Sequence, residues 1–203
     1  MITSKQSKMR KSKVKEKILI REGYKVMRQY GYQGTSIDKI ASNLDIPKSS
    51  FYYYFKNKEV FAESVLVYYV TILLNRVDHT LYDYSLSPKQ RLVKLYSDHI
   101  DFYTNTGGAF YGNFTSNLLN ELGETNKKIK EIITTFNNRM KDSHIDCLQS
   151  ARRAGEIDKS LDAEKLTMLI IYSWEGAVLR ANNTGNLRSL FAFREILRDF
   201  ILK

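Results

Sequence analysis

TSIDKIASNLDIPKSSFYYYF, residues 35–55, predicts two short helices joined by a tight turn. The apolar residues of the first helix recur at helical spacing and form one face: Ile37, Ile40, Ala41 and Leu44. Thr35 and Asp38 have the spacing of a capping box, so we expect the first helix to start there. Residues 45–47, Asp-Ile-Pro, predict the break, because aspartate tolerates a left-handed backbone and proline disfavours helix at the residue before it.

The second helix, residues 48–54, places Phe51 against the first. Its other faces carry an amine, hydroxyls and aromatic rings: Lys48, Ser49, Ser50, Tyr52, Tyr53 and Tyr54. This arrangement is typical of a helix-turn-helix, whose second helix enters the DNA major groove with short donors at its leading end and phosphate ligands at its margins. A plain helical hairpin with solvated polar residues is the alternative, because such hairpins also occur in proteins that never bind DNA.

The placement of charge favours the DNA-binding interpretation. The chain carries a formal net charge of +10. Residues 1–58 hold 14 Lys and Arg against 4 Asp and Glu, and the remaining residues hold 18 of each. All the excess positive charge therefore lies in the segment with the helix-turn-helix, which indicates a polyanionic partner. A membrane surface is a poorer fit, because the basic run from Lys5 to Lys17 lacks a wide apolar face.

Composition limits the class and compartment of the protein. With 203 residues and 43% hydrophobic residues, the chain can bury a sizeable core. Its one cysteine cannot form an internal disulfide, and no signal peptide is evident, so we expect a cytoplasmic location. The longest apolar stretch, Leu166–Leu179, is too short to span a bilayer and contains Glu175, so no membrane association is expected.

Periodicity along the chain predicts an all-α fold of about nine helices without strands. The expected helices cover residues 14–30, 35–44, 48–54, 57–82, a segment opening at 87–90, 113–122, 126–154, a segment capped by Asp162, and 187–202. Residues 1–12 are expected to form a disordered basic arm, residues 13–58 a three-helix DNA-binding domain, and residues 59–203 a second helical domain.

Several motifs together resemble the DNA-binding domain of the tetracycline-repressor (TetR) family over about residues 18–65. They are Gly31-Tyr32, Thr35-Ser36, Ile40-Ala41, Ile46-Pro47-Lys48 and, above all, FYYYFKNK at residues 51–58. The resemblance implies a homodimeric, ligand-responsive regulator, most often a repressor, that binds a palindromic operator. It implies that residues 59–203 bind a small-molecule inducer and form the dimer.

By position, the resemblance implies a set of DNA contacts. Thr35 and Ser36 would hold a phosphate at a helix N-terminus, and Lys58 would hold another. Lys48, Ser49 and Ser50 would face base edges, Tyr52 would lie on the backbone or a thymine methyl, and Tyr53 and Tyr54 would lie near phosphates. The chain departs from the family pattern at Asp45, which replaces a turn glycine, and at Tyr54, which replaces a histidine.

The second domain offers candidates for a ligand cavity and an interface. Residues expected to surround a central cavity are Phe102, Tyr103, Phe114, Phe136, Met140 and Trp174, although any single one of them could instead simply fill a core. Residues expected at a four-helix dimer interface are Leu179, Leu190 and Phe193.

Two further functions remain open from the sequence. A non-specific DNA-organising protein would show the same charge asymmetry but no cavity. A small helical enzyme would use Cys147 with His144, three residues earlier, although no third group orients the imidazole and a buried structural thiol is the alternative. His79, His99 and His144 lack metal-ligand spacing, so we expect no enzyme activity, metal or cofactor.

Overall fold

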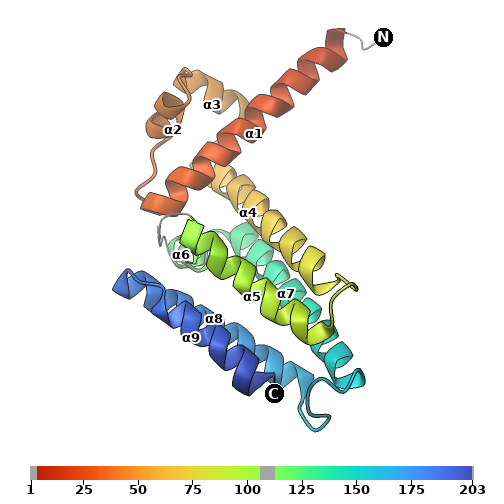
Figure 1. Ribbon diagram of the computed structural model, residues 1–203. Coiled ribbons are helices and arrows are strands. Elements are labelled where there is room, and N and C mark those ends of the chain that lie inside the picture. The colour runs from red at the N-terminus through yellow and green to blue at the C-terminus, as the bar shows by residue number, and fades with distance from the viewer. Residues whose placement is uncertain (1–3, 106–112, 203) are drawn as a thin grey trace. The chain divides into compact units, whose positions relative to one another are not determined.

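The computed structural model describes residues 4–105 and 113–202, with side chains from residue 13 onwards. Over these residues the protein is all α-helical, as predicted (Figure 1). The helices are α1 (Ser4–Tyr30), α2 (Ile37–Asn43), α3 (Lys48–Tyr54), α4 (Lys58–Leu81), α5 (Pro88–Asn105), α6 (Phe114–Leu122), α7 (Lys127–Arg153), α8 (Ala163–Thr184) and α9 (Arg188–Ile196), which continues as a π-helical turn over Leu197–Ile201. The chain divides into two compact units. Unit 1 comprises residues 1–71 and 114–133, and unit 2 comprises residues 72–113 and 134–203.

Helix α1 begins earlier than the sequence pattern predicted. It is helical from Ser4, so the disordered arm expected over residues 1–12 is wrong for residues 4–12. The physical reason is that this stretch contains no Gly or Pro and is rich in Lys, Arg, Gln and Met, which are good helix formers. Among the residues of α1 whose side chains are described, Val14 and Ile18 are exposed and Leu19 is the first that is buried. The helix ends at Gly31 in the left-handed conformation, as expected.

A cluster of three phenylalanines holds the short helices of unit 1. Phe51 of α3 lies 4.9 Å from Phe61 of α4 between ring centroids, and Phe55 lies 4.7 Å from Phe61. All three rings are buried. Gly23 of α1 faces this cluster, and a Cβ there would overlap the ring of Phe61. The missing side chain therefore lets α1 and α4 approach closely while the cluster fixes α3.

The cap of α2 differs from the expected one. The helix starts at Ile37 with Ser36 as N-cap, whose hydroxyl accepts from the Lys39 backbone N–H at 3.1 Å. The capping box expected from Thr35 and Asp38 is wrong, because the Thr35 hydroxyl is buried and donates to the Gly31 carbonyl at 2.7 Å. The predicted left-handed turn is confirmed, with Asp45 at φ +50°.

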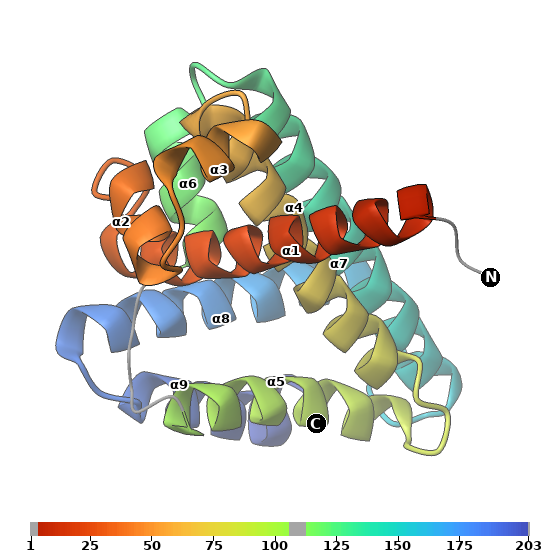
Figure 2. The ribbon, with the colours of Figure 1, turned by 90° about the horizontal axis from the view of Figure 1, so that it is seen from above.

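Unit 2 is built around α5, α8 and α9, together with the C-terminal parts of α4 and α7. Helix α9 packs on both α8 and α5 (Figure 2). The cap expected at residues 87–90 is confirmed, because the Ser87 N–H donates to Gln90 at 3.0 Å and the Gln90 N–H donates to the Ser87 hydroxyl at 3.4 Å. Asp162 caps α8, as predicted, by accepting from the N–H groups of Glu164 and Lys165. Each cap satisfies backbone donors that the first turn of a helix leaves free.

Helix α4 combines length with apolar composition. Of the described helices it alone is long and apolar enough to cross a bilayer, with a mean hydropathy of 1.4 over its most apolar window. From the sequence only Leu166–Leu179 was considered in this respect, and α4 was not identified. Several apolar side chains of α4 are buried inside the protein: Phe61, Ala62, Val65, Leu66, Val70, Val77 and Leu81. Helix α4 thus serves as a core helix of both units.

Candidate DNA-binding surface and ligand site

Helix α3 presents its polar face to solvent while Phe51 anchors it from below. Tyr52 is 50% exposed and Tyr53 is 74% exposed, so their rings and hydroxyls are accessible from solvent. Lys48 and Ser49 are also exposed, whereas Ser50 and Tyr54 are half-buried. The ring of Tyr54 contacts that of Tyr53 edge-on at 4.9 Å, so Tyr54 supports its neighbour.

Lys48 has an acidic partner in the free protein. Its Nζ lies 2.9 Å from Asp38 of α2, and this hydrogen bond raises the pKa of the ammonium group. Both side chains are largely exposed, so the pair is weak and can be exchanged. Lys48 would therefore have to leave Asp38 in order to reach a base edge or a phosphate.

The two residues expected at the N-terminus of α2 have different environments. The Ser36 hydroxyl is occupied as a helix cap but remains at the surface. Thr35 is only 2% exposed, so its side chain is not presented to a phosphate. The sequence pattern could not predict the burial of Thr35, because this burial depends on the path of the turn before α2.

Lys58 lies at the first position of α4 with its Nζ 4.2 Å from the centre of the Tyr32 ring. Partial burial lowers the pKa of Lys58, and the nearby Glu121 carboxylate opposes that effect. The cation therefore rests on an aromatic face in the free protein. Lys39, which the sequence reasoning missed, makes a similar contact 3.3 Å from the centre of the Tyr30 ring.

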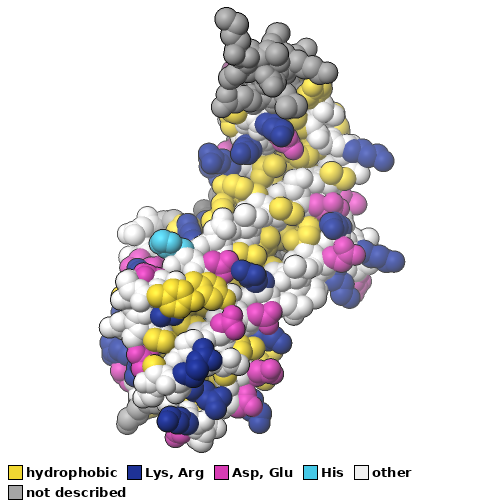
Figure 3. Space-filling view, turned by 90° about the vertical axis from the view of Figure 1, so that its right-hand side faces the viewer, with side chains coloured by type: hydrophobic (Ala, Val, Ile, Leu, Met, Phe, Trp, Pro, Cys, Tyr) yellow, Lys and Arg dark blue, Asp and Glu magenta, His cyan; other side chains and the backbone are white. Residues whose placement is uncertain are grey.

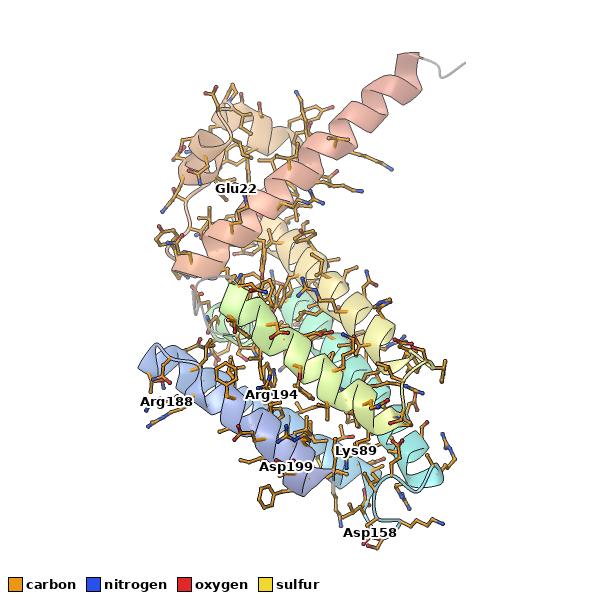
Figure 4. The ribbon with its side chains drawn as sticks, in the orientation of Figure 1. Glu22, Lys89, Asp158, Arg188, Arg194 and Asp199 are labelled. Carbon is orange, nitrogen blue, oxygen red and sulfur yellow. The ribbon has the colours of Figure 1, made fainter. Side chains whose placement is uncertain are left out.

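The framework below this surface is tied by polar contacts that sequence reasoning also missed. Glu22 points from α1 toward α2 (Figure 4), and its Oε1 accepts from the Asn43 amide at 2.9 Å. Glu121 of α6 accepts from the backbone N–H groups of Tyr32 at 2.9 Å and Gln33 at 2.7 Å. No local pattern indicates either contact, because the partners are far apart in sequence.

Charges elsewhere are mixed. On the face drawn in Figure 3, Lys and Arg side chains lie among Asp and Glu side chains, and no large block of one sign is visible among the coloured residues. This agrees with the equal numbers of acidic and basic residues after Lys58. The basic character belongs to the N-terminal segment.

Aromatic rings gather around Trp174 in unit 2. Trp174 lies 5.2 Å from Tyr96, 5.3 Å from Phe193 and 5.8 Å from His99 between ring centroids. The His99 Nδ1 atom is buried and has no hydrogen bond of good geometry. These residues form a packed aromatic cluster that contains one buried polar atom.

The predicted ligand residues do not all meet. Tyr103 joins the Trp174 cluster at 6.5 Å, and Met140 packs against the same core. The Phe102 ring faces the guanidinium of Arg76 at 5.0 Å, and Phe136 is buried in α7. Phe114 instead belongs to unit 1, where its ring contacts Tyr24 at 5.4 Å and Tyr69 at 5.1 Å.

Cys147 and His144 are not paired. His144 Nδ1–H donates to the Met140 carbonyl at 2.8 Å, so its Nε2 accepts from the Tyr96 hydroxyl at 2.9 Å. The Cys147 thiol donates to the Pro88 carbonyl at 3.3 Å, and burial raises the pKa of this thiol to about 11. A nucleophile would require a thiolate, so this cysteine is suited to packing. The described residues also contain no cluster of three or more potential metal ligands.

Two of the three predicted interface residues lie in the core of the protomer. Leu190 is fully buried and Phe193 is 4% exposed, so we correct their expected placement at an interface. Leu179 is 61% exposed. Other large apolar side chains of α8, α9 and the following turn are also exposed: Met168, Leu169, Tyr172, Phe191, Ile196 and Phe200. Sequence periodicity does not show which side of a helix with apolar residues on several faces is covered.

The fold and the exposed recognition helix define a helix-turn-helix transcription regulator. The sequence profile described as "Bacterial regulatory proteins, tetR family" matches residues 19–65, and that described as "Tetracyclin repressor-like, C-terminal domain" matches residues 88–197. The chain therefore belongs to the TetR family of transcriptional regulators. The resemblance seen in the sequence is confirmed, and the matched N-terminal segment begins at Leu19.

Similar proteins are regulators over nearly the full chain. The HTH-type transcriptional repressor DhaR of Mycobacterium sp. (strain GP1) is 28% identical over 91% of this chain and 90% of its own. The transcriptional regulator AcuR of Cereibacter sphaeroides is 28% identical over 80% of this chain and 74% of its own. A regulatory protein TetR from Rhodobacter sphaeroides has a crystal structure with a TM-score of 0.81, 26% identity, and coverage of 90% of this chain and 96% of its own.

The buried histidines predict a pH-dependent stability. Burial lowers the pKa values of His99 and His144 to about 4 from 6.5. The unfolded chain therefore binds more protons below pH 6.5, so stability is complete above that pH and falls as the pH drops toward 4. Urea unfolding should show this loss, and His144→Asn should reduce it by about 1–3 kcal/mol. His79→Asn changes an exposed imidazole and is the control. Equal acid sensitivity of His144→Asn and wild type would contradict the assignment.

Proposed function

We propose that this protein is a ligand-responsive repressor that binds a palindromic operator as a homodimer and is released by a small-molecule inducer. The observation that carries the proposal is the exposed face of α3, which is held rigidly by buried Phe51 on the strongly basic part of the chain. A rigid recognition helix loses little conformational freedom on binding, which favours specific contacts. Because its target is operator DNA, we place the protein in the cytoplasm.

The DNA contacts follow from the exposed positions. Lys48, Ser49 and Ser50 lie at the leading end of α3 and would reach base edges in the major groove. Tyr52, Tyr53 and Tyr54 would contact the backbone or a thymine methyl, while Ser36 and Lys58 would contact phosphates on either side. Thr35, which is buried, supports the turn beneath these residues.

The exposed apolar face of α8 and α9 supports dimerisation. Tyr172, Gly176 and Leu179 recur at a spacing of four and three residues, so they follow one stripe of α8. No atom lies within 4 Å of the position that a Cβ of Gly176 would occupy, which leaves room for close approach by another helix. Apolar stripes of this kind pair in four-helix interfaces around a two-fold axis. A two-fold dimer would match the symmetry of a palindromic operator.

The cluster around Trp174 supports ligand binding in unit 2. We place the inducer beside Trp174, Tyr103 and Met140, with the buried His99 Nδ1 as a polar contact. Phe102 and Phe136 are further candidates from the sequence alone. Helix α4 contributes residues to both units, starts at Lys58 and ends in unit 2. It therefore offers a continuous path from the ligand cluster to a phosphate contact. For function, we divide the chain into a DNA-binding domain over residues 13–58 and a ligand and dimer domain over residues 59–203.

Neither alternative function gains support from a specific observation. A non-specific DNA-organising protein would share the basic N-terminal segment, but the similar proteins found over most of the chain are transcriptional regulators. An enzyme using Cys147 and His144 would need the two to interact, but each has another hydrogen-bond partner.

Lys58→Ala should weaken DNA binding about equally for all sequences. A lost phosphate contact releases fewer counterions, so the slope of log affinity against log salt should fall by about one. The operator is first obtained by selecting bound fragments from the source genome, and operator and random duplexes are then titrated at several salt concentrations. Lys141→Ala, an exposed lysine of α7, is the control. An unchanged salt slope for Lys58→Ala would refute the phosphate contact, and failure to select any fragment would refute the repressor.

Leu179→Arg should convert the dimer to monomers. It would bury an unpaired charge in the proposed interface, and operator affinity should fall with dimerisation because one half-site offers too few contacts. Sedimentation velocity measures the oligomeric state. Asn137→Arg, on an exposed position of α7, controls for added charge and should remain dimeric. A Leu179→Arg protein that sediments as an intact dimer would exclude this face.

Operator and inducer should weaken each other's binding by the same factor, about 5–150-fold, because linkage is reciprocal. Trp174 is the only tryptophan of the chain, so its fluorescence reports on the proposed site. Compounds that change this fluorescence are titrated with and without operator duplex. Equal compound affinities in the two titrations would show that the site does not regulate DNA binding.

A further inference from the structure

The turn between α1 and α2 is held by a single carboxylate from α6. Glu121 Oε1 accepts from the Tyr32 N–H at 2.9 Å, and Oε2 accepts from the Gln33 N–H at 2.7 Å. Each oxygen thus takes one of two consecutive backbone donors. Hydrogen bonds to an ionised carboxylate are about twice as strong as those between neutral groups. Glu121 is therefore well placed to fix the backbone of this turn.

Gly31 makes this close approach possible. Its φ of +71° is a conformation that side chains disfavour, and a Cβ there would lie 2.9 Å from Glu121 Oε1. The residue that ends α1 is thus also the residue that admits the carboxylate. One glycine meets both requirements.

The turn held by Glu121 leads directly into the DNA-binding helices. Within the turn, the Thr35 hydroxyl donates to the Gly31 carbonyl at 2.7 Å, and the Thr35 N–H donates to the Tyr32 carbonyl at 3.2 Å. Ser36 then caps α2. The ring of Tyr32 also supports Lys58. A displacement of this turn would therefore move α2, α3 and a proposed phosphate contact together.

Helix α6 has an unusual place in the chain. Helix α6 and the first turns of α7 belong to unit 1. The residues before them, 72–113, and the residues after them, 134–203, belong to unit 2. In the sequence, the segment with α6 therefore lies between two segments of unit 2. Glu121 links this segment to the start of the helix-turn-helix.

We propose that Glu121 is a positioning residue for DNA binding, which fixes the recognition helix through the Tyr32–Gln33 turn. The inference rests on the proposed function and concerns how the same DNA-binding surface is oriented. Glu121 itself contacts no DNA in this scheme. A turn freed from the carboxylate would have to be ordered on binding, which weakens specific recognition.

The sign of the effect separates positioning from simple charge. Glu121→Gln keeps the size of the side chain but removes the charge, and its amide can accept a hydrogen bond from only one of the two N–H groups at full strength. Loss of a negative charge near DNA would by itself strengthen binding to any duplex. Loss of positioning should instead weaken operator binding. Glu124→Gln is the matched control, because Glu124 is exposed three residues further on and makes no hydrogen bond to any described residue.

The experiment measures operator and random-duplex affinities and the hydrogen exchange of the Tyr32 and Gln33 amides by NMR. Glu121→Gln should bind the operator about tenfold more weakly. Its random-duplex affinity should stay within about twofold of wild type, and both amides should exchange faster. Glu124→Gln should match wild type in operator affinity, in random-duplex affinity and in the exchange of both amides. Glu121→Asp, which retains the charge but shortens the side chain, should also lose operator affinity.

The proposal is overturned if Glu121→Gln binds the operator as tightly as Glu124→Gln does. It is also overturned if operator and random-duplex affinities fall by the same factor, since that result indicates general disruption. A wild-type protein that prefers no duplex would refute the proposed function itself. In that case faster exchange in Glu121→Gln would still show that the carboxylate holds the turn, so the two failures are distinguishable.

Discussion

The packing of Phe51 against Phe55 and Phe61 is the interaction on which the DNA-binding surface depends. Helix α3 has seven residues, which is too short for stability by its own hydrogen bonds. Its conformation must therefore come from tertiary packing, and Phe51 is the only residue of α3 that is buried. Gly23 contributes by leaving space for Phe61, so α1 closes the other side of the cluster. The outward residues of α3 owe their fixed positions to this buried ring.

Burial also determines which reactive groups are chemically active. Cys147 and His144 have side chains that could act as nucleophile and base, but both lie in an apolar core. Removal from water disfavours the thiolate and the imidazolium alike, so burial raises the pKa of the thiol and lowers that of the imidazole. Each group then satisfies its hydrogen-bonding capacity locally. The same residues at a polar surface would have supported a different interpretation.

The two apolar faces of α8 differ in burial. Leu166, Ile170 and Val178 are buried within the protomer, while Leu169, Tyr172 and Leu179 remain exposed. A helix with apolar residues on both faces is expected to be covered on both sides, and the exposed stripe is the face that the proposed dimer would cover.

The sequence by itself determined features that depend on residues close together in the chain. The bounds of α3, the left-handed turns at Gly31 and Asp45, and the cap at Asp162 all follow from local sterics and hydrogen bonding. The class of protein also followed, because the motif around residues 51–58 and the charge asymmetry are both linear features. Local rules failed where two residues competed for one role, as with Thr35 and Ser36 at the cap of α2.

Only the tertiary structure decided which apolar faces are covered and which distant groups meet. The helical spacing of Leu190 and Phe193 does not tell whether they face the core or an interface. In the structure they are buried against α5 and α8. The contact of Glu121 with Tyr32 joins residues 89 positions apart, and that of Tyr96 with His144 joins residues 48 positions apart. Such contacts depend on how helices pack, and packing is set by the summed shape of many side chains. No single stretch of sequence carries that information.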